Sequence, residues 1–329
     1  MKAITFNTLG SPLDVLVASN IEKPSPGSGE VLIRICSSAV NPSDVKKRAG
    51  PSPGLLDHGF IVPHSDGAGV IEAVGLGVSA SRVGERVWLY QCQYSRRFGT
   101  AAEYVSIPSN RAVALPAAIS FDEGACMGIP AMTAHRCVFS DGPVAGKTVL
   151  VTGGAGRVGN YAIQWAKQAG AQVIPTAGSL KAKEDSLAAG ADKVCTYSGP
   201  DLSQVVLSMT SGKGVDRVID GEFGANLQGA LDLIGVGGVI ATYGSMQVPE
   251  PSLPFRKMMF LDLTLRLILV YAMPEEAKQE AVRDISSSLE GHLLKHRIAH
   301  RLPLDAAATA HELVEKGGFY GAVVLRVQD

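Results

Sequence analysis

The sequence predicts an α/β protein that contains a doubly wound parallel sheet, the Rossmann arrangement, together with a second, mostly β domain. Three observations lead to this prediction. Short strands separated by Gly and Pro fill the first third of the chain, a glycine-rich turn follows the apolar run at 148–151, and helices then alternate with strands. Such alternation requires a parallel sheet that helices cover on both faces through right-handed crossovers.

The composition is that of an ordinary globular chain. With 329 residues, of which 46% are hydrophobic, it is long enough for two domains with large cores. The 30 basic and 31 acidic residues balance, and the longest basic run is Lys46–Arg48, so a nucleic-acid interface is not expected. The apolar stretch Met258–Met273 is interrupted by Asp262 and Arg266 and is too short and too charged to span a bilayer. Because the first residues lack an apolar signal core, we expect a cytoplasmic protein.

The cysteines indicate a reducing compartment. Their number is odd, and they show neither a CxxC pair nor clustered His partners. We therefore interpret them as free thiols that form neither a disulfide framework nor a zinc site. They are Cys36, Cys92, Cys126, Cys137 and Cys195.

The first part of the chain has the pattern of a compact β unit. We expect strands at Val31–Cys36, Gly69–Val74, Glu85–Tyr90 and Ala101–Ile107, each bounded by turn residues. The segment Gly50–Gly59 is long and irregular, which is typical of a lid or of the edge of a binding site.

Two further segments of this part predict helices. In Ala39–Gly50 we expect a strand end that leads into a helix with Ser43 as its cap. Asn41 precedes a proline and is therefore kept out of the helical region, so its amide is either a ligand contact or a turn former. The segment Asp122–Phe139 has a helical period that is broken at Gly128–Pro130, which predicts two helical pieces.

The central turn predicts a dinucleotide site. A buried strand at Thr148–Val151 leads into Gly154, Gly156 and Gly159, and a helical pattern follows at Tyr161–Lys167. This GxGxxG spacing between a strand and a helix assigns the first glycine to a tight turn, the second to a close approach by a pyrophosphate and the third to helix packing. A merely flexible glycine loop is the less consistent interpretation.

The end of the second strand favours NADP(H) over NAD(H). An acidic residue that would bind an NAD ribose is absent after Gln172–Thr176, where Ser179, Lys181 and Lys183 follow instead. A hydroxyl and two cations suit a ribose phosphate. The alternative is that both lysines only form a solvated helix start.

The remainder of the chain continues the alternation. We expect helices at 181–189, 202–210 and 227–234 and strands at 193–195, 215–219 and 239–243. Leu261–Val270 has leucine at alternate positions and a polar second face, which predicts an edge strand and a homodimer or homotetramer through it. The tail predicts helices at 275–290 and 306–316 and strands at 296–302 and 322–327, which return to the first domain. The predicted domains are therefore 1–122, 123–267 and the returning segment 268–329.

Sequence runs that span most of the chain resemble those of the zinc-free medium-chain dehydrogenases/reductases, in particular the NADPH-dependent quinone oxidoreductase (zeta-crystallin-like) group. This resemblance implies a GroES-like catalytic domain beside the Rossmann domain. The runs are GSPLDVL near the start, VNPSD at 40–44, PHSDGAGVIEAVG at 63–75, VGERV at 83–87, AAEYVSIP at 101–108, GIPAMTAH at 128–135, VLVTGGAGRVG at 149–159, GVDRVID at 214–220 and the closing GGFYGAVVL.

The resemblance also implies that the catalytic zinc of related alcohol dehydrogenases is missing. Asn41 stands in place of the first cysteine ligand, Ser65 in place of the histidine and Ile129 in place of the later cysteine, and none of these can bind zinc in the manner of the family. Without a Lewis acid an alkoxide is hard to stabilise, so reduction of a quinone or of an electron-poor alkene is expected.

The resemblance also implies which residues of this chain contact the cofactor. Asn41 and Thr133 are implied to position the nicotinamide, with no clear acid or base; His64, Tyr90 and Tyr94 are the side chains that could reach a cleft. The implied cofactor-binding residues are Gly154, Ala155, Gly156, Arg157, Val158 and Gly159 at the pyrophosphate, Ser179, Lys183 and Tyr197 at the adenosine phosphate, and Gly244 and Ser245 at the nicotinamide ribose.

Three positions depart from the family pattern. His64 stands where the family more often has Gly, the run GPSPGLL lacks a Tyr that is often near the substrate, and Ala322 replaces a common Lys or Arg. The sequence thus predicts an NADPH-dependent quinone reductase that binds no metal. Reduction of an enone or alkenal is the alternative, and a non-catalytic NADPH sensor is the second.

Overall fold

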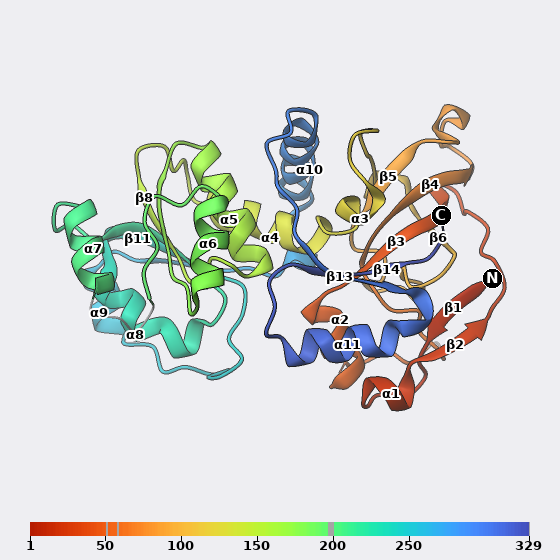
Figure 1. Ribbon diagram of the computed structural model, residues 1–329, viewed down its shortest axis with the longest axis horizontal. Helices are drawn as coiled ribbons and strands as arrows, with labels where there is room; N and C mark the ends of the chain where they lie inside the picture. Colours follow the sequence, from red (N-terminus) through yellow and green to blue (C-terminus); the bar gives the residue numbers. More distant parts are fainter. Residues whose placement is uncertain (51, 58, 197–200, 329) are drawn as a thin grey trace. The chain divides into compact units, whose positions relative to one another are not determined.

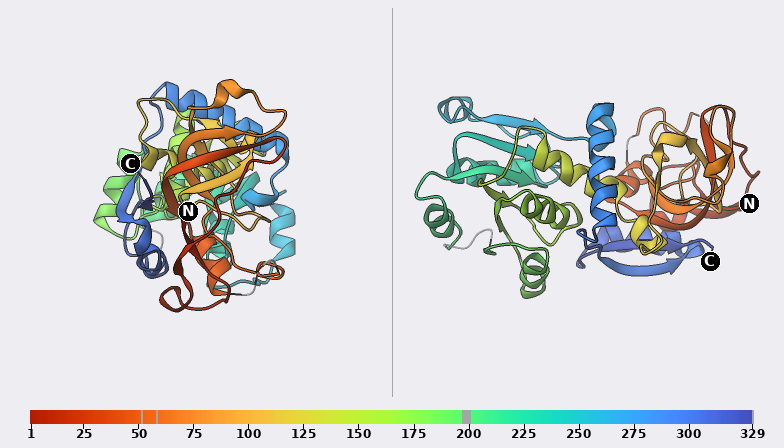
Figure 2. Two further views of the ribbon diagram at one scale, coloured as in Figure 1. Left: turned by 90° about the vertical axis from the view of Figure 1, so that its right-hand side faces the viewer. Right: turned by 90° about the horizontal axis from the view of Figure 1, so that it is seen from above.

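The structure is a computed structural model that describes residues 1–50, 52–57, 59–196 and 201–328. The chain forms two compact units: the first is Met1–Ile129 together with Asp284–Asp329, and the second is Pro130–Arg283. The boundaries therefore lie at 129/130 and 283/284, where the sequence predicted 122/123 and 267/268. Both ends of the chain belong to the first unit (Figures 1 and 2).

A seven-stranded sheet forms the body of the first unit. Its strand order is β13-β14-β3-β4-β5-β7, with β6 paired to β3, and a separate hairpin joins β1 and β2. The bounds are β1 (Lys2–Thr5), β2 (Val17–Asn20), β3 (Glu30–Val40), β4 (Asp66–Val74), β5 (Arg86–Leu89), β6 (Tyr104–Pro108), β7 (Ala112–Ala114), β13 (Ile298–Pro303) and β14 (Ala322–Arg326). The helices of this unit are α1 (Pro12–Val15), α2 (Pro42–Ala49), α3 (Phe121–Gly124) and α11 (Ala307–Lys316).

The last strand of the chain completes this sheet. β14 runs antiparallel to β3, with Val323 opposite Val40 and Arg326 opposite Ser37, and it pairs on its other side with β13. The first unit is therefore assembled from two segments that are far apart in the sequence.

The second unit contains a five-stranded parallel sheet in the order β12-β11-β10-β8-β9. Its strands are β8 (Thr148–Val151), β9 (Gln172–Pro175), β10 (Val215–Asp220), β11 (Ile234–Thr242) and β12 (Thr264–Leu267). The predicted strand at 193–195 is wrong, because this segment contributes only a single parallel bridge from Cys195 to Thr176 beside β9. With this bridge counted as a reduced third strand, the order matches the Rossmann order 3-2-1-4-5-6.

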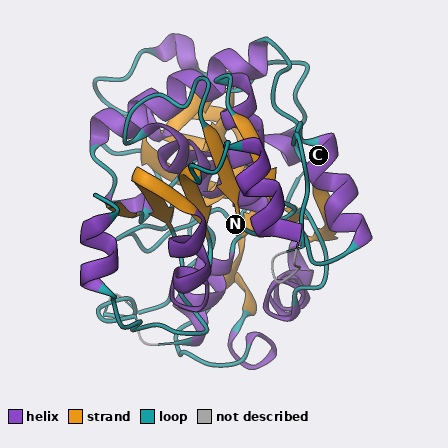
Figure 3. Cartoon of the chain, turned by 90° about the vertical axis from the view of Figure 1, so that its left-hand side faces the viewer, coloured by secondary structure: helices purple, strands orange, loops and turns teal. Residues whose placement is uncertain are grey.

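Helices cover both faces of this sheet (Figures 1 and 3). Leu150, Val218 and Ile240 belong to one hydrophobic cluster with residues of α7 and α8, whereas α5 contacts β8, β9 and β10. Val149 and Ile219 are equally buried and, as neighbours in the strands, face the other side. The predicted doubly wound α/β fold is confirmed. The helices are α5 (Arg157–Gln168), α6 (Leu180–Ala188), α7 (Asp201–Met209), α8 (Phe223–Leu233) and α9 (Phe255–Phe260).

Two helices contain the unit boundaries, α4 (Gly128–Phe139) and α10 (Glu275–Glu290). The range of α10 is the predicted one. The predicted pair of helical pieces at 122–139 is present as α3 and α4, but the break lies at residues 125–127, and Pro130 sits in the first turn of α4, where a missing N–H costs nothing.

The predicted edge strand at Leu261–Val270 is much shorter than expected. β12 covers only Thr264–Leu267, since α9 ends at Phe260 and Asp262 then turns the chain with a left-handed φ of 45°. β12 nevertheless lies at the edge of the sheet, next to β11.

All five cysteines are buried free thiols, as predicted. Within the described residues, every helix is too short or too polar to cross a membrane.

Candidate functional site

The glycine-rich turn lies between β8 and α5 in the second unit. Gly153 has the left-handed φ of 63°, so the tight turn lies there and not at Gly154, to which the sequence assigned it. A Cβ on Gly154 would lie 2.4 Å from Cβ of Pro175, and one on Gly159 would lie 2.5 Å from the Gly153 carbonyl oxygen. These glycines therefore allow the turn, β9 and α5 to pack together.

The start of α5 offers its backbone to a ligand. Gly156 is the N-cap residue of α5, and Arg157 and Val158 form its first turn. Cap side chains are absent at this end, and the first N–H groups of a helix lack intrahelical partners and carry partial positive charge. An exposed Gly156 leaves room for a phosphate at this helix end.

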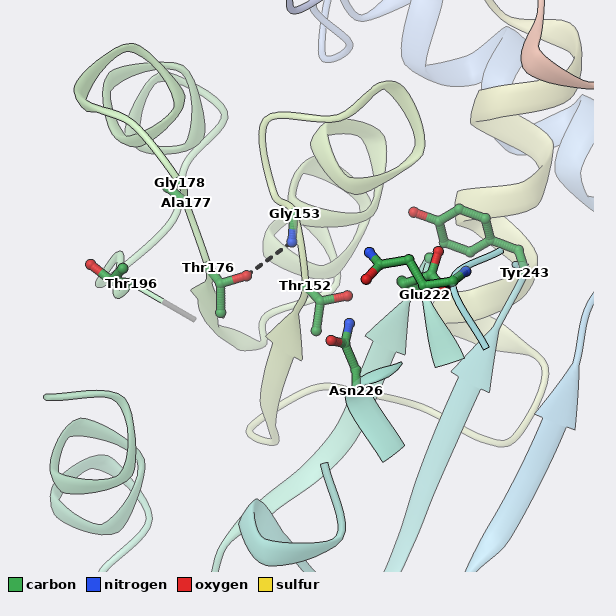
Figure 4. A pocket seen from close by; sticks show the side chains of 11 residues that line it. Thr152, Gly153, Thr176, Ala177, Gly178, Thr196, Glu222, Asn226 and Tyr243 are labelled. Carbon is green, nitrogen blue, oxygen red and sulfur yellow. Dashed lines mark hydrogen bonds between the residues drawn. The ribbon is translucent and has the colours of Figure 1, made fainter. Parts of the chain in front are cut away.

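A cavity of about 410 Å³ adjoins the turn (Figure 4). It lies at the carboxyl ends of β8, β9, β10 and β11, which is where open α/β sheets bind their ligands. The lining residues are Thr152, Gly153, Thr176, Ala177, Gly178, Thr196, Gly221, Glu222, Asn226, Tyr243 and Gln247.

Hydrogen bonds hold the residues of this cavity in place. The Thr176 hydroxyl accepts a bond of 2.9 Å from the backbone N–H of Gly153, which fixes the turn against β9 (Figure 4). One carboxylate oxygen of the fully buried Asp220 accepts bonds from the Thr152 hydroxyl and from the Asn226 amide, the latter at 2.9 Å. Glu222 accepts two backbone N–H bonds, from Met246 at 2.8 Å and from Gln247 at 2.7 Å.

Sequence reasoning missed these polar residues. Thr152 and Thr176 each directly follow a buried strand, and Asp220 ends β10, so their positions at strand ends were the available signal. Only the sheet order brings them together, since β10 pairs with β8.

Residues predicted for the adenosine phosphate follow Gly178, which lines the cavity. Ser179 caps α6, because its hydroxyl accepts the Ala182 N–H at 3.1 Å, and Lys183 is exposed one turn later. Lys181 instead forms an ion pair of 2.8 Å with Asp185. Tyr197 lies outside the described residues.

Gly244 and Ser245 follow β11 and line a neighbouring cavity of about 410 Å³, which shares Tyr243 with the first. The Ser245 hydroxyl accepts the Gly224 N–H at 2.8 Å and donates to the Val248 carbonyl at 2.5 Å. This hydrogen bonding fixes the loop that follows β11.

The two residues predicted to position the nicotinamide belong to different units, Asn41 to the first and Thr133, buried in α4, to the second. Asn41, and not the predicted Ser43, is the N-cap of α2, and its backbone N–H donates to Asp44 at 2.9 Å. Its side-chain amide donates to Asp66 at 2.9 Å. Asn41 thus takes part in the turn that starts α2, and its nicotinamide contact stays a prediction.

The candidate proton donors are not alike. His64 is fully buried, with one ring nitrogen 2.9 Å from His311 and the other 2.9 Å from the Ser38 hydroxyl, so both ring nitrogens are occupied within the first unit. Tyr90 is also buried, and its hydroxyl donates to the Asn110 carbonyl. Tyr94 is half-buried and lines a cavity of the first unit.

Comparisons with known proteins agree with this geometry. Residues 27–117 match the alcohol dehydrogenase GroES-like domain, and residues 158–287 match the zinc-binding dehydrogenase model. Quinone oxidoreductase of Rattus norvegicus is 32% identical to the chain, and the alignment covers 99% of this chain and 97% of that protein. The 2-haloacrylate reductase of Burkholderia sp is 30% identical, with 99% of each chain covered. The structure of Escherichia coli quinone oxidoreductase in complex with NADPH has a TM-score of 0.85 at 26% identity and covers 99% of this chain and 100% of that one.

The zinc in the name of the matched model does not fit this chain. At the three ligand positions, the Asn41 amide and the backbone N–H of Ile129 both donate to one carboxylate oxygen of Asp66, at 2.9 and 2.8 Å, and Ser65 supplies only a hydroxyl. Within the described ranges, three His, Cys, Asp or Glu side chains nowhere come together as a metal site.

The matched domains, the full-length relatives and the parallel sheet with its glycine turn point to one family. The chain belongs to the medium-chain dehydrogenases/reductases, within their quinone oxidoreductase group.

Proposed function

We propose that the protein is an NADPH-dependent reductase of quinone-type acceptors that requires no zinc. The observation that carries this proposal is the glycine turn at 153–159, which opens beside a cavity at the carboxyl ends of the strands. Relatives named quinone oxidoreductase, one of them solved in complex with NADPH, support the choice of cofactor and acceptor.

The residues of the second unit would hold the cofactor in an extended conformation. The start of α5, from Gly156 to Val158, binds the pyrophosphate through backbone N–H groups. Ser179 and Lys183 bind the adenosine phosphate, and Gly244 and Ser245 lie by the nicotinamide ribose. NADPH supplies the hydride when it is bound, and the protein contributes position and exclusion of water.

The lack of zinc ligands limits which acceptors the protein can reduce. The Asn41 amide and the Ile129 N–H both donate to Asp66, so a carbonyl oxygen of the acceptor would meet no Lewis acid at these positions. A quinone tolerates this, because its reduction yields an aromatic hydroquinone whose oxygens take protons from solvent.

Reduction of an activated C=C bond is the second candidate, and the similarity to a 2-haloacrylate reductase favours it. A comparison of NADPH oxidation with a quinone and with an enone separates the two reactions. Turnover with the enone alone would replace the first proposal by the second.

The cofactor preference has its own test. Lys183→Met should raise the KM for NADPH roughly tenfold and leave that for NADH unchanged, because only the former loses a charged hydrogen bond. Lys316→Met, an exposed lysine of the first unit, is the control. Preference of the wild-type enzyme for NADH, or stoichiometric zinc in active protein, would overturn the proposal.

We also infer that the protein is a homodimer or homotetramer that associates through β12. The strand lies at the edge of the parallel sheet, and Leu267 at its end and Leu269 just after it are 70% and 58% exposed. An exposed apolar strand edge of this kind is stabilised by pairing with its copy.

A further inference from the structure

A cavity of about 410 Å³ lies within the first unit and has a positively charged lining. Three cationic side chains, Lys47, Arg96 and Arg97, line it, and its described lining residues include no carboxylate. Its volume is within the range of pockets that bind small molecules. The charge of this lining favours an anion.

Lys47 is held in a defined position at the cavity. Its ammonium nitrogen lies 2.9 Å from the side-chain oxygen of Gln93 and 3.4 Å from the Ser65 hydroxyl. Gln93 is itself buried, and its amide nitrogen donates to the Arg96 carbonyl at 3.0 Å, which turns its oxygen toward Lys47. Burial lowers the pKa of Lys47, although Asp44 and Asp66 act in the opposite direction, so a further anion next to it would favour the charged form.

The two arginines differ in how their charge is balanced. Arg96 donates to Glu30 at 2.9 Å and to the Ser106 carbonyl at 2.7 Å. Arg97 donates to the Phe60 carbonyl at 3.1 Å and stacks 3.7 Å above the Phe60 ring. It forms no ion pair with any part of the chain that the structure describes. Arg97 therefore brings a charge to the cavity that the surrounding protein does not neutralise.

The backbone on one side of the cavity is strained. Gln91 and Ser95 have left-handed φ angles of 55° and 53°, a conformation that is unfavourable for residues other than glycine. Between them stand Gln93 and Tyr94, both of which line the cavity. Strain that presents polar side chains to a cavity is typical of binding sites.

Part of the lining is apolar. Pro53 and Leu55, from the segment that follows α2, and Ile61 line the cavity, and Ile61 is buried. A ligand that matches both the cationic and the apolar lining residues carries a negative charge and an apolar body.

We propose that this cavity binds a small organic carboxylate, and that the acceptor of the reaction proposed above carries one. The second statement rests on the proposed function, whereas the first depends only on the cavity. Lys47 and Arg97 bind the carboxylate, and Leu55 and Ile61 contact the body of the acceptor.

Matched pairs of acceptors test this proposal. A naphthoquinone carboxylate and a cyclohexenone carboxylate are each compared with their methyl esters for NADPH oxidation, and the binding of each carboxylate without cofactor is measured by calorimetry. The wild type should show a KM for each reduced carboxylate that is roughly tenfold below that of its ester, since a charge-assisted bond is gained.

Variants assign the effect to the cavity. Lys47→Met and Arg97→Gln should each raise the KM and the calorimetric Kd for the carboxylate roughly tenfold and leave the ester unchanged. Lys46→Met is the matched control, because Lys46 is the exposed neighbour on the same helix. Circular dichroism of both cavity variants verifies that they are folded.

The possible failures are distinguishable. Equal KM values for acid and ester would overturn the statement that the acceptor carries a carboxylate and leave the reductase intact. If no acceptor is reduced, the proposed function fails, and calorimetry decides the cavity: binding that Lys47→Met weakens supports it, and the absence of binding by the wild type overturns it.

Discussion

His64 adopts a backbone conformation that side chains with a β-carbon rarely occupy, with φ at 79°. Its ring is anchored by a chain of hydrogen bonds with one consistent direction. The Thr100 hydroxyl donates its one hydrogen to the Asp66 carbonyl and therefore accepts a hydrogen bond from the Ser38 hydroxyl. Ser38 in turn accepts from His64, and the other ring nitrogen of His64 accepts from His311. This arrangement stabilises a strained residue at a position where the family more often has glycine.

Both rings of this pair are neutral at ordinary pH. Burial lowers the pKa of His64 and of His311 to about 3, with Lys47 and Arg48 contributing in the same direction and Asp44 opposing. The unfolded chain takes up protons near pH 6.5, whereas the folded chain does not. The free energy of unfolding should therefore fall as the pH drops below 6.5.

His311→Gln tests this dependence, because glutamine keeps a donor toward His64 and does not titrate. Each histidine lowers the free energy of unfolding by about 1.5 kcal/mol as the pH falls from its unfolded pKa to about pH 5. The free energy of unfolding of the variant should therefore fall by about 1.5 kcal/mol less than that of the wild type over this range. Urea unfolding at several pH values measures the effect. His296, with a pKa lowered to about 4, continues to contribute in the variant, and His292→Asn at an exposed site serves as control. An unchanged slope in His311→Gln would contradict the assignment.

Gly154→Ala should destabilise the second unit by about 2–3 kcal/mol, because the new methyl group would overlap Pro175 and crowd Ser186. The midpoint of urea unfolding measures this loss, and NADPH affinity should fall with it. Gly178→Ala is the matched control, since a Cβ at Gly178 would meet no atom within 4 Å and the φ of this residue lies outside the left-handed region. Equal midpoints for the two variants would refute the packing argument.

At the scale of elements, Asp122 connects segments from both ends of the first unit. The carboxylate of Asp122, which lies on α3, accepts three hydrogen bonds from other elements. The donors are the Ser37 hydroxyl of β3 at 2.6 Å, the Arg301 guanidinium of β13 at 2.8 Å and the Arg326 guanidinium of β14 at 3.0 Å. These bonds lower the pKa of Asp122 in spite of its partial burial.

Asp122→Asn should reduce the free energy of unfolding by about 1–2 kcal/mol, because asparagine keeps one acceptor and loses the charge. The loss is moderated by solvent, since both arginines are about half exposed. Thermal and urea unfolding measure it. Asp305→Asn, which removes an exposed partner of Lys2, should change stability by less than ~0.5 kcal/mol, and a larger change there would argue against the distinction.

Elements with strong local signals were predictable from the sequence, and those that depend on context were not. α10 and β8 have the predicted bounds, because periodicity and apolar runs fix them locally. The leucine alternation at 261–270 was misleading, since a helix end, a left-handed Asp262 and a four-residue strand produce the same pattern.

The candidate site shows the same division. The glycine turn is a local motif, and the sequence located it within one residue. The network around Asp220 and the ring pair of His64 and His311 join residues that are distant along the chain, so no spacing predicts them. The fold had to be known before these contacts could be identified.

At the scale of the whole molecule, the proposed assembly depends on the apolar surface near β12. Leu267→Lys should shift the protein toward monomers, because a charge would be placed in an interface that excludes water. Size-exclusion chromatography with light scattering measures the mass of the particle. Leu76→Lys, at a leucine of the first unit that is 83% exposed, should have no effect on mass. A wild-type protein that is already monomeric would exclude this role of β12.

The pairing of β14 with β3 sets an order of events during synthesis. The ribosome produces β3 and β6 early, and β6 pairs with residues 30–34 of β3, but β14, which pairs with residues 37–40, emerges only after the entire second unit has been translated. The nascent first unit therefore waits with an open sheet edge while the second unit can already form around its contiguous segment. A chaperone that protects this protein during synthesis would therefore bind the open edge of β3 in the time between the translation of β3 and the translation of β14.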